Sequence, residues 1–269
     1  MSLRIKLAII SAASLMLVVL LLVAINIFDT GLIKQKSNSN TLSANLGLFK
    51  YLVNEHLVSM EPLADEIANE FDLRTAVKQS NKADVETFAK RYIELTGGTG
   101  NYKTLELYDR NKQQLFVSDS SLTLKQADLY ISQINNDTPF IVDLGLLNSN
   151  EAVSVIAIPL KSRRKIIGYA VFSKDLSSIV NKLASTQQSQ VFLVSSDLMV
   201  THNSNSERSI DIDPLLSDEQ SSLLEIVETD DALFEVTKQV FTNKQEEKIA
   251  YLLIARDETE LLTQLRQYN

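Results

Sequence analysis

Residues 153–176 read VSVIAIPLKSRRKIIGYAVFSKDL, two apolar runs separated by a short basic segment. The runs predict strands at Ala152–Leu160 and Lys165–Ser173, because short apolar segments rich in β-branched residues favour strands. The polar residues Lys161–Arg164 between them predict a hairpin turn. This stretch therefore predicts an antiparallel pair of strands joined by a basic turn.

Further strands and helices flank this hairpin. The strands predicted before it are Thr104–Tyr108, Gln114–Val117 and Phe140–Leu144, with a helix at Leu124–Ile134. The elements predicted after it are helices at Leu176–Ala184, Ser217–Ile226 and Glu258–Gln267, and strands at Gln190–Val194, Leu198–His202, Leu233–Phe241 and Lys248–Ala255. The first group predicts an antiparallel sheet with helices on one side, and the second repeats its order in shortened form. The fold class is therefore α+β, with two related modules in tandem.

The N-terminal segment predicts a membrane anchor. Residues 7–28 contain no charged side chain, and as a helix they would extend about 33 Å, enough to cross a bilayer. A cleaved signal peptide is the alternative, but its apolar region is usually shorter, about 7–15 residues. Arg4 and Lys6 before the segment, weighed against Lys34 and Lys36 after it, favour a cytoplasmic N-terminus. We expect one membrane-spanning helix, with the main domain outside the cytoplasm.

An apolar stripe follows the anchor, with spacings that alternate between four and three residues. Its members are Leu42, Leu46, Phe49, Val53, His56, Met60, Leu63 and Ile67. This period predicts a long packed helix, which Pro62 either kinks or divides. The first six members, Leu42 to Met60, either form the seam of a homodimer or pack on the protein's own sheet, and both arrangements are compatible at different heights. A second helix is predicted at Lys82–Leu95, ended by a glycine-rich loop.

Composition argues against several classes of protein. The net charge of -8 and the pI near 4.9 disfavour nucleic acid as a partner, because phosphate binding needs a basic face. The absence of cysteine excludes disulfides, thiolate nucleophiles and iron–sulfur clusters. No serine-hydrolase elbow and no HExxH helix is present, so the chain as given is not predicted to be an enzyme. No metal site and no cofactor are predicted.

Individual polar residues receive structural interpretations. His56 is expected to be a packed or register-setting residue of the helical stripe, and His202 to have a surface or turn role. The pairs Asp211/Asp213 and Asp230/Asp231 lack the further ligands of a calcium loop, and we expect solvated loops there. The basic turn around Arg163 and Arg164 is the densest positive patch of the sequence and is predicted to be solvated, although an acidic ligand or lipid head groups would also suit it.

Three stretches carry a resemblance to a known family. They are LELYDRNKQQLFVSDS (105–120), the hairpin 153–176 with its apolar-Gly-apolar segment at Gly168, and VFLVSSDLMVTHNS (191–204). With the anchor and the long helix before them, they resemble the double Cache (PAS-like) sensor region of bacterial chemoreceptors, sensor histidine kinases and membrane-bound diguanylate cyclases. The domain limits that follow are 1–28 for the cytoplasmic tail and anchor, 29–99 for the two helices, 100–187 for the membrane-distal module, 188–257 for the membrane-proximal module and 258–269 for a returning helix.

The resemblance implies a ligand-sensing periplasmic region, anchored in the bacterial inner membrane, that binds a small solute in its distal module. The alternative is a membrane-anchored scaffold protein that binds another protein. The residues expected to line the pocket of the distal module, from their positions on its strands and basic turn, are Tyr108, Asp143, Ser154, Lys161 and Tyr169. An amino-acid ligand is not implied, because the family's amino-acid site includes a Trp and this chain has none.

Overall fold

A computed structural model describes residues 43–95, 102–135, 140–204, 222–229 and 232–260, together with Met16, Ile210, Ile212 and Leu216. The predicted anchor, apart from Met16, and residues 261–269 of the closing helix lie outside the described residues, as does Leu42 of the stripe. Within the part of the chain that is described, no helix is long and apolar enough to cross a membrane.

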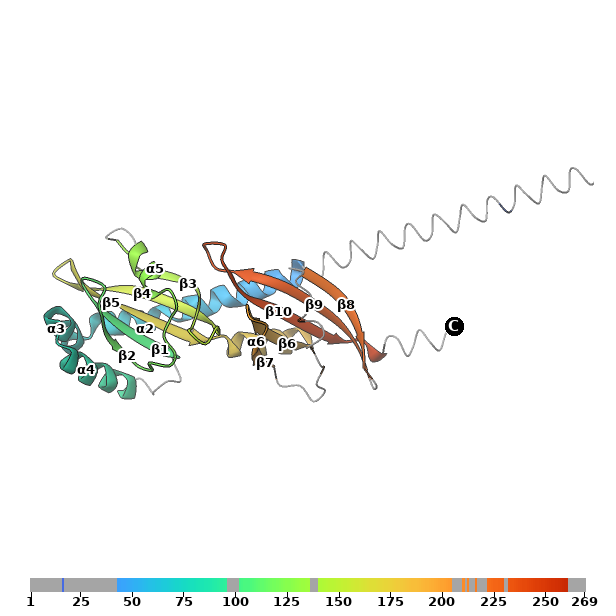
Figure 1. Cartoon of the computed structure of the whole chain (residues 1–269), viewed down its shortest axis with the longest axis horizontal. Helices are drawn as coiled ribbons and strands as arrows, with labels where there is room; N and C mark the ends of the chain where they lie inside the picture. Colours follow the sequence, from blue (N-terminus) through green and yellow to red (C-terminus); the bar gives the residue numbers. More distant parts are fainter. Residues whose placement is uncertain are drawn as a thin grey trace, which may run out of the picture. The chain divides into compact units, whose positions relative to one another are not determined.

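The predicted hairpin lies within a five-stranded antiparallel sheet, with its second strand in the middle (Figure 1). Its strands are β1 (Thr104–Asp109), β2 (Gln114–Val117), β3 (Ile141–Leu146), β4 (Ala152–Ser162) and β5 (Lys165–Asp175). They lie in the order β2-β1-β5-β4-β3. The strand pairs expected from the sequence are confirmed, with β4 and β5 each extended by two residues at one end.

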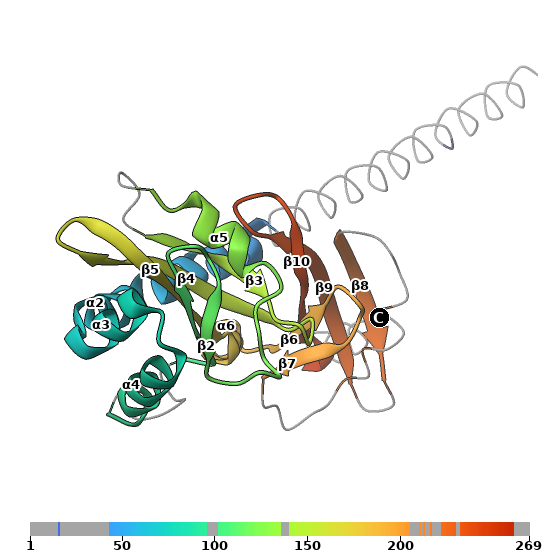
Figure 2. The same ribbon diagram turned by 60° about the vertical axis from the view of Figure 1, so that its left-hand side comes forward.

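Both faces of this first sheet are covered. Every residue of β1 is buried, and so are nine consecutive residues of β4, which requires packing on both sides. On one side Leu105 and Leu107 join a core shared with α2 (Glu61–Asn69), α3 (Phe71–Gln79) and α4 (Lys82–Leu95). On the other side Val153 and Val155 pack against α5 (Ala127–Gln133), which Figure 2 shows across the sheet from α4. The prediction of helices on one side only is therefore wrong.

The helical stripe packs on the protein's own sheets. Residues 43–59 are helical, and a new helix, α2, starts at Glu61 with Pro62 in its first turn, where a missing N–H is tolerated. The stripe residues Phe49, Val53, His56 and Met60 are buried, and the Phe49 ring lies 5.2 Å from that of Phe241. Leu46 is half-buried. The homodimer seam stays a prediction.

The second module is a separate five-stranded antiparallel sheet. After α6 (Ser177–Gln187) its strands are β6 (Gln190–Ser195), β7 (Val200–Asn203), β8 (Ser222–Glu228), β9 (Leu233–Thr242) and β10 (Lys248–Asp257). They lie in the order β7-β6-β10-β9-β8, which parallels that of the first sheet. The helix predicted at Ser217–Ile226 is wrong from Ser222 onward, because this segment pairs with the open edge of β9 and contains the β-branched Ile226 and Val227.

Gly168 allows α3 to approach the first sheet closely. A Cβ atom at this position would lie 2.4 Å from the carbonyl oxygen of Tyr108 and 2.4 Å from Cγ1 of Val77. Only a residue without a side chain fits there. The helix α3, which the sequence interpretation missed, is thereby held against β1 and β5, with Leu73, Ala76 and Val77 buried.

Candidate functional site

The side of the first sheet covered by α5 is the candidate ligand face. We call it the α5 face; its defining residues are Glu106, Tyr108, Val153, Val155 and Tyr169. Most of its other buried members are apolar, so the few polar groups on it stand out. Polar groups placed within an apolar layer are the elements that orient a small ligand.

Glu106 is a deeply buried carboxylate at the centre of this polar group. Its side chain accepts hydrogen bonds from the hydroxyl of Tyr108, from Nε2 of Gln114 at 3.1 Å and from the backbone N–H of Leu124 at 2.8 Å. Only 1% of the residue is exposed, and no Lys or Arg within the described ranges forms an ion pair with it. The carboxylate therefore ties β1, β2 and the segment before α5 together with neutral donors alone.

The tyrosines of this face are held protonated. Burial raises the pKa of Tyr108, and the neighbouring Glu106 carboxylate raises it further. Burial also raises the pKa of Tyr130 in α5, whose hydroxyl donates to the carbonyl of Leu144 at 3.0 Å. Both phenols consequently act as hydrogen-bond donors across the physiological pH range.

The structure brings together two of the five predicted pocket residues. Tyr108 and Tyr169 lie directly opposite each other on β1 and β5, on the α5 face. Ser154 points to the opposite side of the sheet, between Ala152 and Ile156 of the other core, and its buried hydroxyl has no hydrogen-bond partner among the described residues. The side chain therefore does not face Tyr108, because alternate residues of a strand point to opposite faces.

The remaining two predicted residues lie at the edges of the module. Lys161 is half-buried at the β4–β5 turn, where its backbone carbonyl oxygen accepts a hydrogen bond from Nη1 of Arg74, with an N–O distance of 3.2 Å. Asp143 is buried on β3, and its carboxylate accepts the backbone N–H of Lys244, in the β9–β10 turn of the second module. Burial raises the pKa of Asp143, although these backbone hydrogen bonds oppose the shift.

Glu106 was missed by the sequence interpretation. Its signal was nevertheless present, because Glu106 stands two residues from Tyr108 within a predicted strand and must therefore share its face. A charged residue on the same face as a predicted pocket tyrosine was the strongest polar candidate on that strand.

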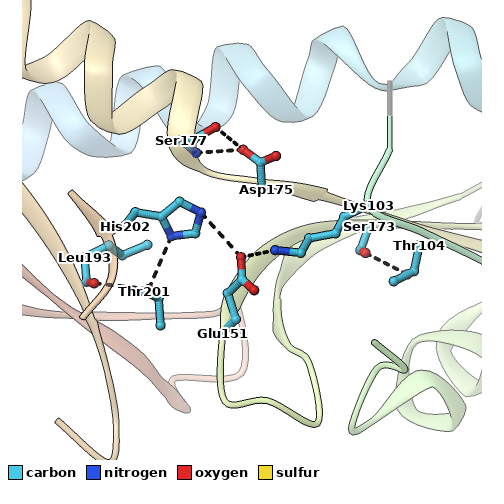
Figure 3. A network of polar contacts seen from close by, with 9 residues as sticks. All are labelled: Lys103, Thr104, Glu151, Ser173, Asp175, Ser177, Leu193, Thr201 and His202. Carbon is cyan, nitrogen blue, oxygen red and sulfur yellow. Dashed lines mark hydrogen bonds and ion pairs between the residues drawn. The ribbon is translucent and has the colours of Figure 1, made fainter. Parts of the chain in front are cut away.

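The two modules meet at a half-buried polar cluster, shown in Figure 3. Glu151, in the β3–β4 turn, lies between Lys103, with which it forms an ion pair, and His202 of β7, whose Nε2 is 3.4 Å from Oε1 of Glu151. The His202 side chain is only 9% exposed and belongs to β7, so the expectation of a surface or turn role is wrong. Burial lowers the pKa of His202, and Lys103 adds to this, while Glu151 and Asp175 oppose it.

Further hydrogen bonds join the modules, among them one from Nε2 of Gln245 to Oε1 of Gln133 at 3.5 Å. Nδ2 of Asn150 donates to Oδ2 of Asp197 at 2.6 Å, beside the Glu151–His202 contact. On the other flank the carboxylate of Asp143 accepts the backbone N–H of Lys244. Beside this contact a cavity of about 260 Å³ lies between β3, the β9–β10 turn and the helix that contains Phe49 and Val53. The junction therefore has a carboxylate–imidazole contact on one side and a backbone contact beside a cavity on the other.

Comparison with known proteins yields structural relatives only. No family model matches the sequence, and no curated protein matches it. The periplasmic domain of Vibrio cholerae LuxQ superposes with a TM-score of 0.53 at 12% identity, over 79% of this chain and 98% of that domain.

Two other solved structures are less similar. The ligand-binding domain of the Campylobacter jejuni chemoreceptor Tlp3, in complex with 4-methylisoleucine, has a TM-score of 0.43 at 17% identity, covering 81% of this chain and 91% of that one. The sensor domain of the V. cholerae histidine kinase DctB has a TM-score of 0.41 at 13% identity, covering 78% and 98%. The match to LuxQ confirms, at the level of fold, the resemblance to double Cache extracytoplasmic sensor regions.

Proposed function

We propose that this chain is the ligand-sensing extracytoplasmic region of a bacterial transmembrane signalling receptor, anchored in the inner membrane by residues 7–28. The distal module, 100–187, takes a small solute on its α5 face. The proximal module, 188–257, passes the resulting change toward the membrane, and the receptor acts as a homodimer. The region itself has no catalytic role.

The observation that carries this proposal is the Glu106 cluster on the α5 face. A buried carboxylate held by Tyr108, Gln114 and the backbone N–H of Leu124 fastens the segment before α5 onto the sheet. A solute with hydrogen-bonding groups would compete for these donors and release or tighten that segment. Binding would then favour one position of α5 over another, which is the requirement for a ligand to shift a conformational equilibrium.

A route from this face to the second module is supported by Asp143. It lies on β3 next to Leu144, whose carbonyl accepts the hydroxyl of Tyr130 in α5. Its own carboxylate accepts the N–H of Lys244 in the second module. A displacement of α5 therefore acts on the strand that holds the β9–β10 turn.

A thermal-shift screen of the full chain tests the proposal. Amino acids, organic acids, amines, purines and sugars would be added in turn, since a ligand that binds the folded state raises its stability. We expect one class to raise the melting temperature, and Tyr108→Phe or Gln114→Ala to reduce that rise. The matched control is Tyr51→Phe, at a tyrosine 65% exposed on the long helix. A rise that survives both site variants would rule out the α5 face.

A second candidate function is a scaffold that binds another protein. The observation that favours it is the filling of the α5 face, where Tyr108, Tyr130 and Tyr169 are all buried in one apolar cluster. If no solute class shifts the melting temperature, this candidate gains support, and the partner would be sought by crosslinking in membranes.

A further inference from the structure

One end of the first sheet carries a cleft that the proposed sensing mechanism does not use. Three turns form it: the α3–α4 junction, the β1–β2 turn and the β4–β5 turn. The cavity has a volume of about 430 Å³. Its lining residues are Lys78, Ser80, Asp109, Arg110, Asn111, Ser162, Arg163, Lys165, Ile166 and Ile167. We call it the tip cleft.

The tip cleft is strongly positive in an otherwise acidic chain. Lys78, Arg110, Arg163 and Lys165 are all exposed, and none of them has an ion pair within the described residues. Asp109 is the one acidic residue in the lining. Its Oδ1 is already bonded to the backbone N–H groups of its own turn, at Asn111 and Gln113, each at 2.8 Å. Four cationic side chains therefore line the cavity, and none of them forms an ion pair with a carboxylate among the described residues.

The β4–β5 turn holds its arginines in an unfavourable backbone conformation. Ser162 pairs with Lys165, so Arg163 and Arg164 form a two-residue hairpin loop, with φ of 48° and 69°. Such loops favour Asn-Gly, because a Cβ atom is strained at positive φ. Lys112 in the neighbouring β1–β2 turn also has a positive φ, of 64°. Cationic residues thus occupy three turn positions where they cost stability, and strain of this kind gathers at functional sites.

The opposite wall of the cleft is fixed by packing. Val77 is held against the sheet at Gly168, which places the next residue, Lys78, and the αL residue Ser80 beside the two turns. The half-buried Ile166 and Ile167 add an apolar surface between the cations. The cleft therefore combines charged groups with a wall suited to a hydrocarbon body.

We propose that the tip cleft binds a small organic anion with at least two oxyanion charges, carried by phosphate or carboxylate groups. Arginine guanidinium groups bind such oxyanions through paired N–H donors. The cavity volume lies in the range of small-molecule sites, about 300–1,000 Å³. This site is distinct from the α5 face and does not depend on the sensing role proposed for that face.

The test is calorimetric titration of the full chain with inorganic pyrophosphate and, separately, with citrate. Sodium chloride keeps the ionic strength equal in all samples, because salt screens exposed charges. The test variant is R163N/R164G, which removes the lining cation Arg163 together with its neighbour Arg164 and relieves the turn. The control is K50Q/R91Q, which removes two exposed cations from helices and leaves the tip cleft intact.

We expect saturable binding of at least one probe to the wild type. The R163N/R164G protein should be more stable than wild type and yet bind about tenfold more weakly, the equivalent of one lost charge-assisted hydrogen bond. K50Q/R91Q should bind as wild type does. A response to pyrophosphate alone, or to citrate alone, assigns the oxyanion as phosphate or carboxylate.

Three results would overturn the proposal: binding of neither probe, unchanged affinity in R163N/R164G, or an equal loss in the control. Tyr108→Phe separates this site from the α5 face, because it should leave anion binding unchanged. Failure at the tip cleft therefore leaves the sensing proposal standing, and failure of the solute screen leaves the tip cleft untouched.

Discussion

The carboxylate of Asp143 in the first module accepts the backbone N–H of Lys244 in the second, with an Oδ1–N distance of 3.0 Å across 101 residues of sequence. The acceptor lies on an edge strand of one sheet and the donor in a turn of the other. A change in the position of β3 therefore acts on the β9–β10 turn through this hydrogen bond.

Replacing Asp143 with alanine is expected to lower the free energy of unfolding by about 1–3 kcal/mol, because the partly buried N–H of Lys244 loses its acceptor. Asp143→Asn keeps an acceptor oxygen and should lose less. Urea denaturation of the full chain, followed by circular dichroism, measures both. An alanine variant as stable as wild type would show that this contact does not hold the modules together.

Replacing Glu106 with alanine is expected to destabilise the protein by about 3 kcal/mol, since three donors lose their shared acceptor. Glu106→Gln retains one oxygen and should cost less. Hydrogen exchange at the Leu124 amide is the specific measurement, and its protection should fall in the alanine variant. Unchanged protection there would mean that Glu106 does not fasten this segment.

Gly168→Ala should destabilise the protein by about 1–3 kcal/mol, the usual range for overpacked buried positions, because the new Cβ would meet the Tyr108 carbonyl oxygen and Val77 at 2.4 Å. Gly47→Ala is the matched control. Nothing lies within 4 Å of its added Cβ, and in a helix the change should stabilise by about 0.5–1 kcal/mol. Chemical denaturation of both variants gives the comparison, and equal effects would contradict the close approach of α3.

Acidification is expected to destabilise the fold through two histidines. Burial lowers the pKa of His56 and of His202 below the ordinary value of 6.5, so the folded state keeps both rings neutral. The unfolded chain takes up these protons first, and stability falls as the pH drops through about 6.5, by at most about 1.4 kcal/mol per pH unit for each ring. Asp143 has the opposite effect on stability at lower pH. Because its pKa is raised in the fold, the folded state takes up this proton before the unfolded chain does, and acidification in that range stabilises the fold.

Melting temperatures of the wild type and of the H56Q/H202Q variant, measured from about pH 7.5 to about pH 5.5, test this linkage. The wild-type curve should fall toward acid pH and the variant curve should be flatter. Parallel curves would mean that other groups carry the pH dependence.

Local patterns determined much of this architecture. Apart from β8, the strands of both sheets follow from apolar runs of strand length, and the turns between them from polar residues such as Asp109-Arg110-Asn111-Lys112. The helix at Lys82–Leu95 has the predicted limits. These features depend on residues within one or two turns of chain, and their periods of 2 and 3.6 are visible in any window of sequence.

The sequence interpretation was wrong where the structure of a segment depends on the element against which it packs. Ser222–Ile226 has helix-compatible residues, yet β9 offers it an open edge and it becomes β8. The α5 helix covers the face opposite to the other helices, because both sides of the first sheet are apolar and each needs a cover.

The amino-acid sequence by itself determined the α+β class and the order of most elements, with α3 and β8 as the exceptions, because the period of each apolar run is visible locally. Only the tertiary structure decided which polar residues act together. Strand register places Tyr108 and Tyr169 on the same face of the first sheet, whereas Ser154 lies on the other face. Asp143 accepts a hydrogen bond from Lys244 of the second module. Contacts between residues about a hundred positions apart depend on how whole sheets and turns pack, and no local period encodes that packing.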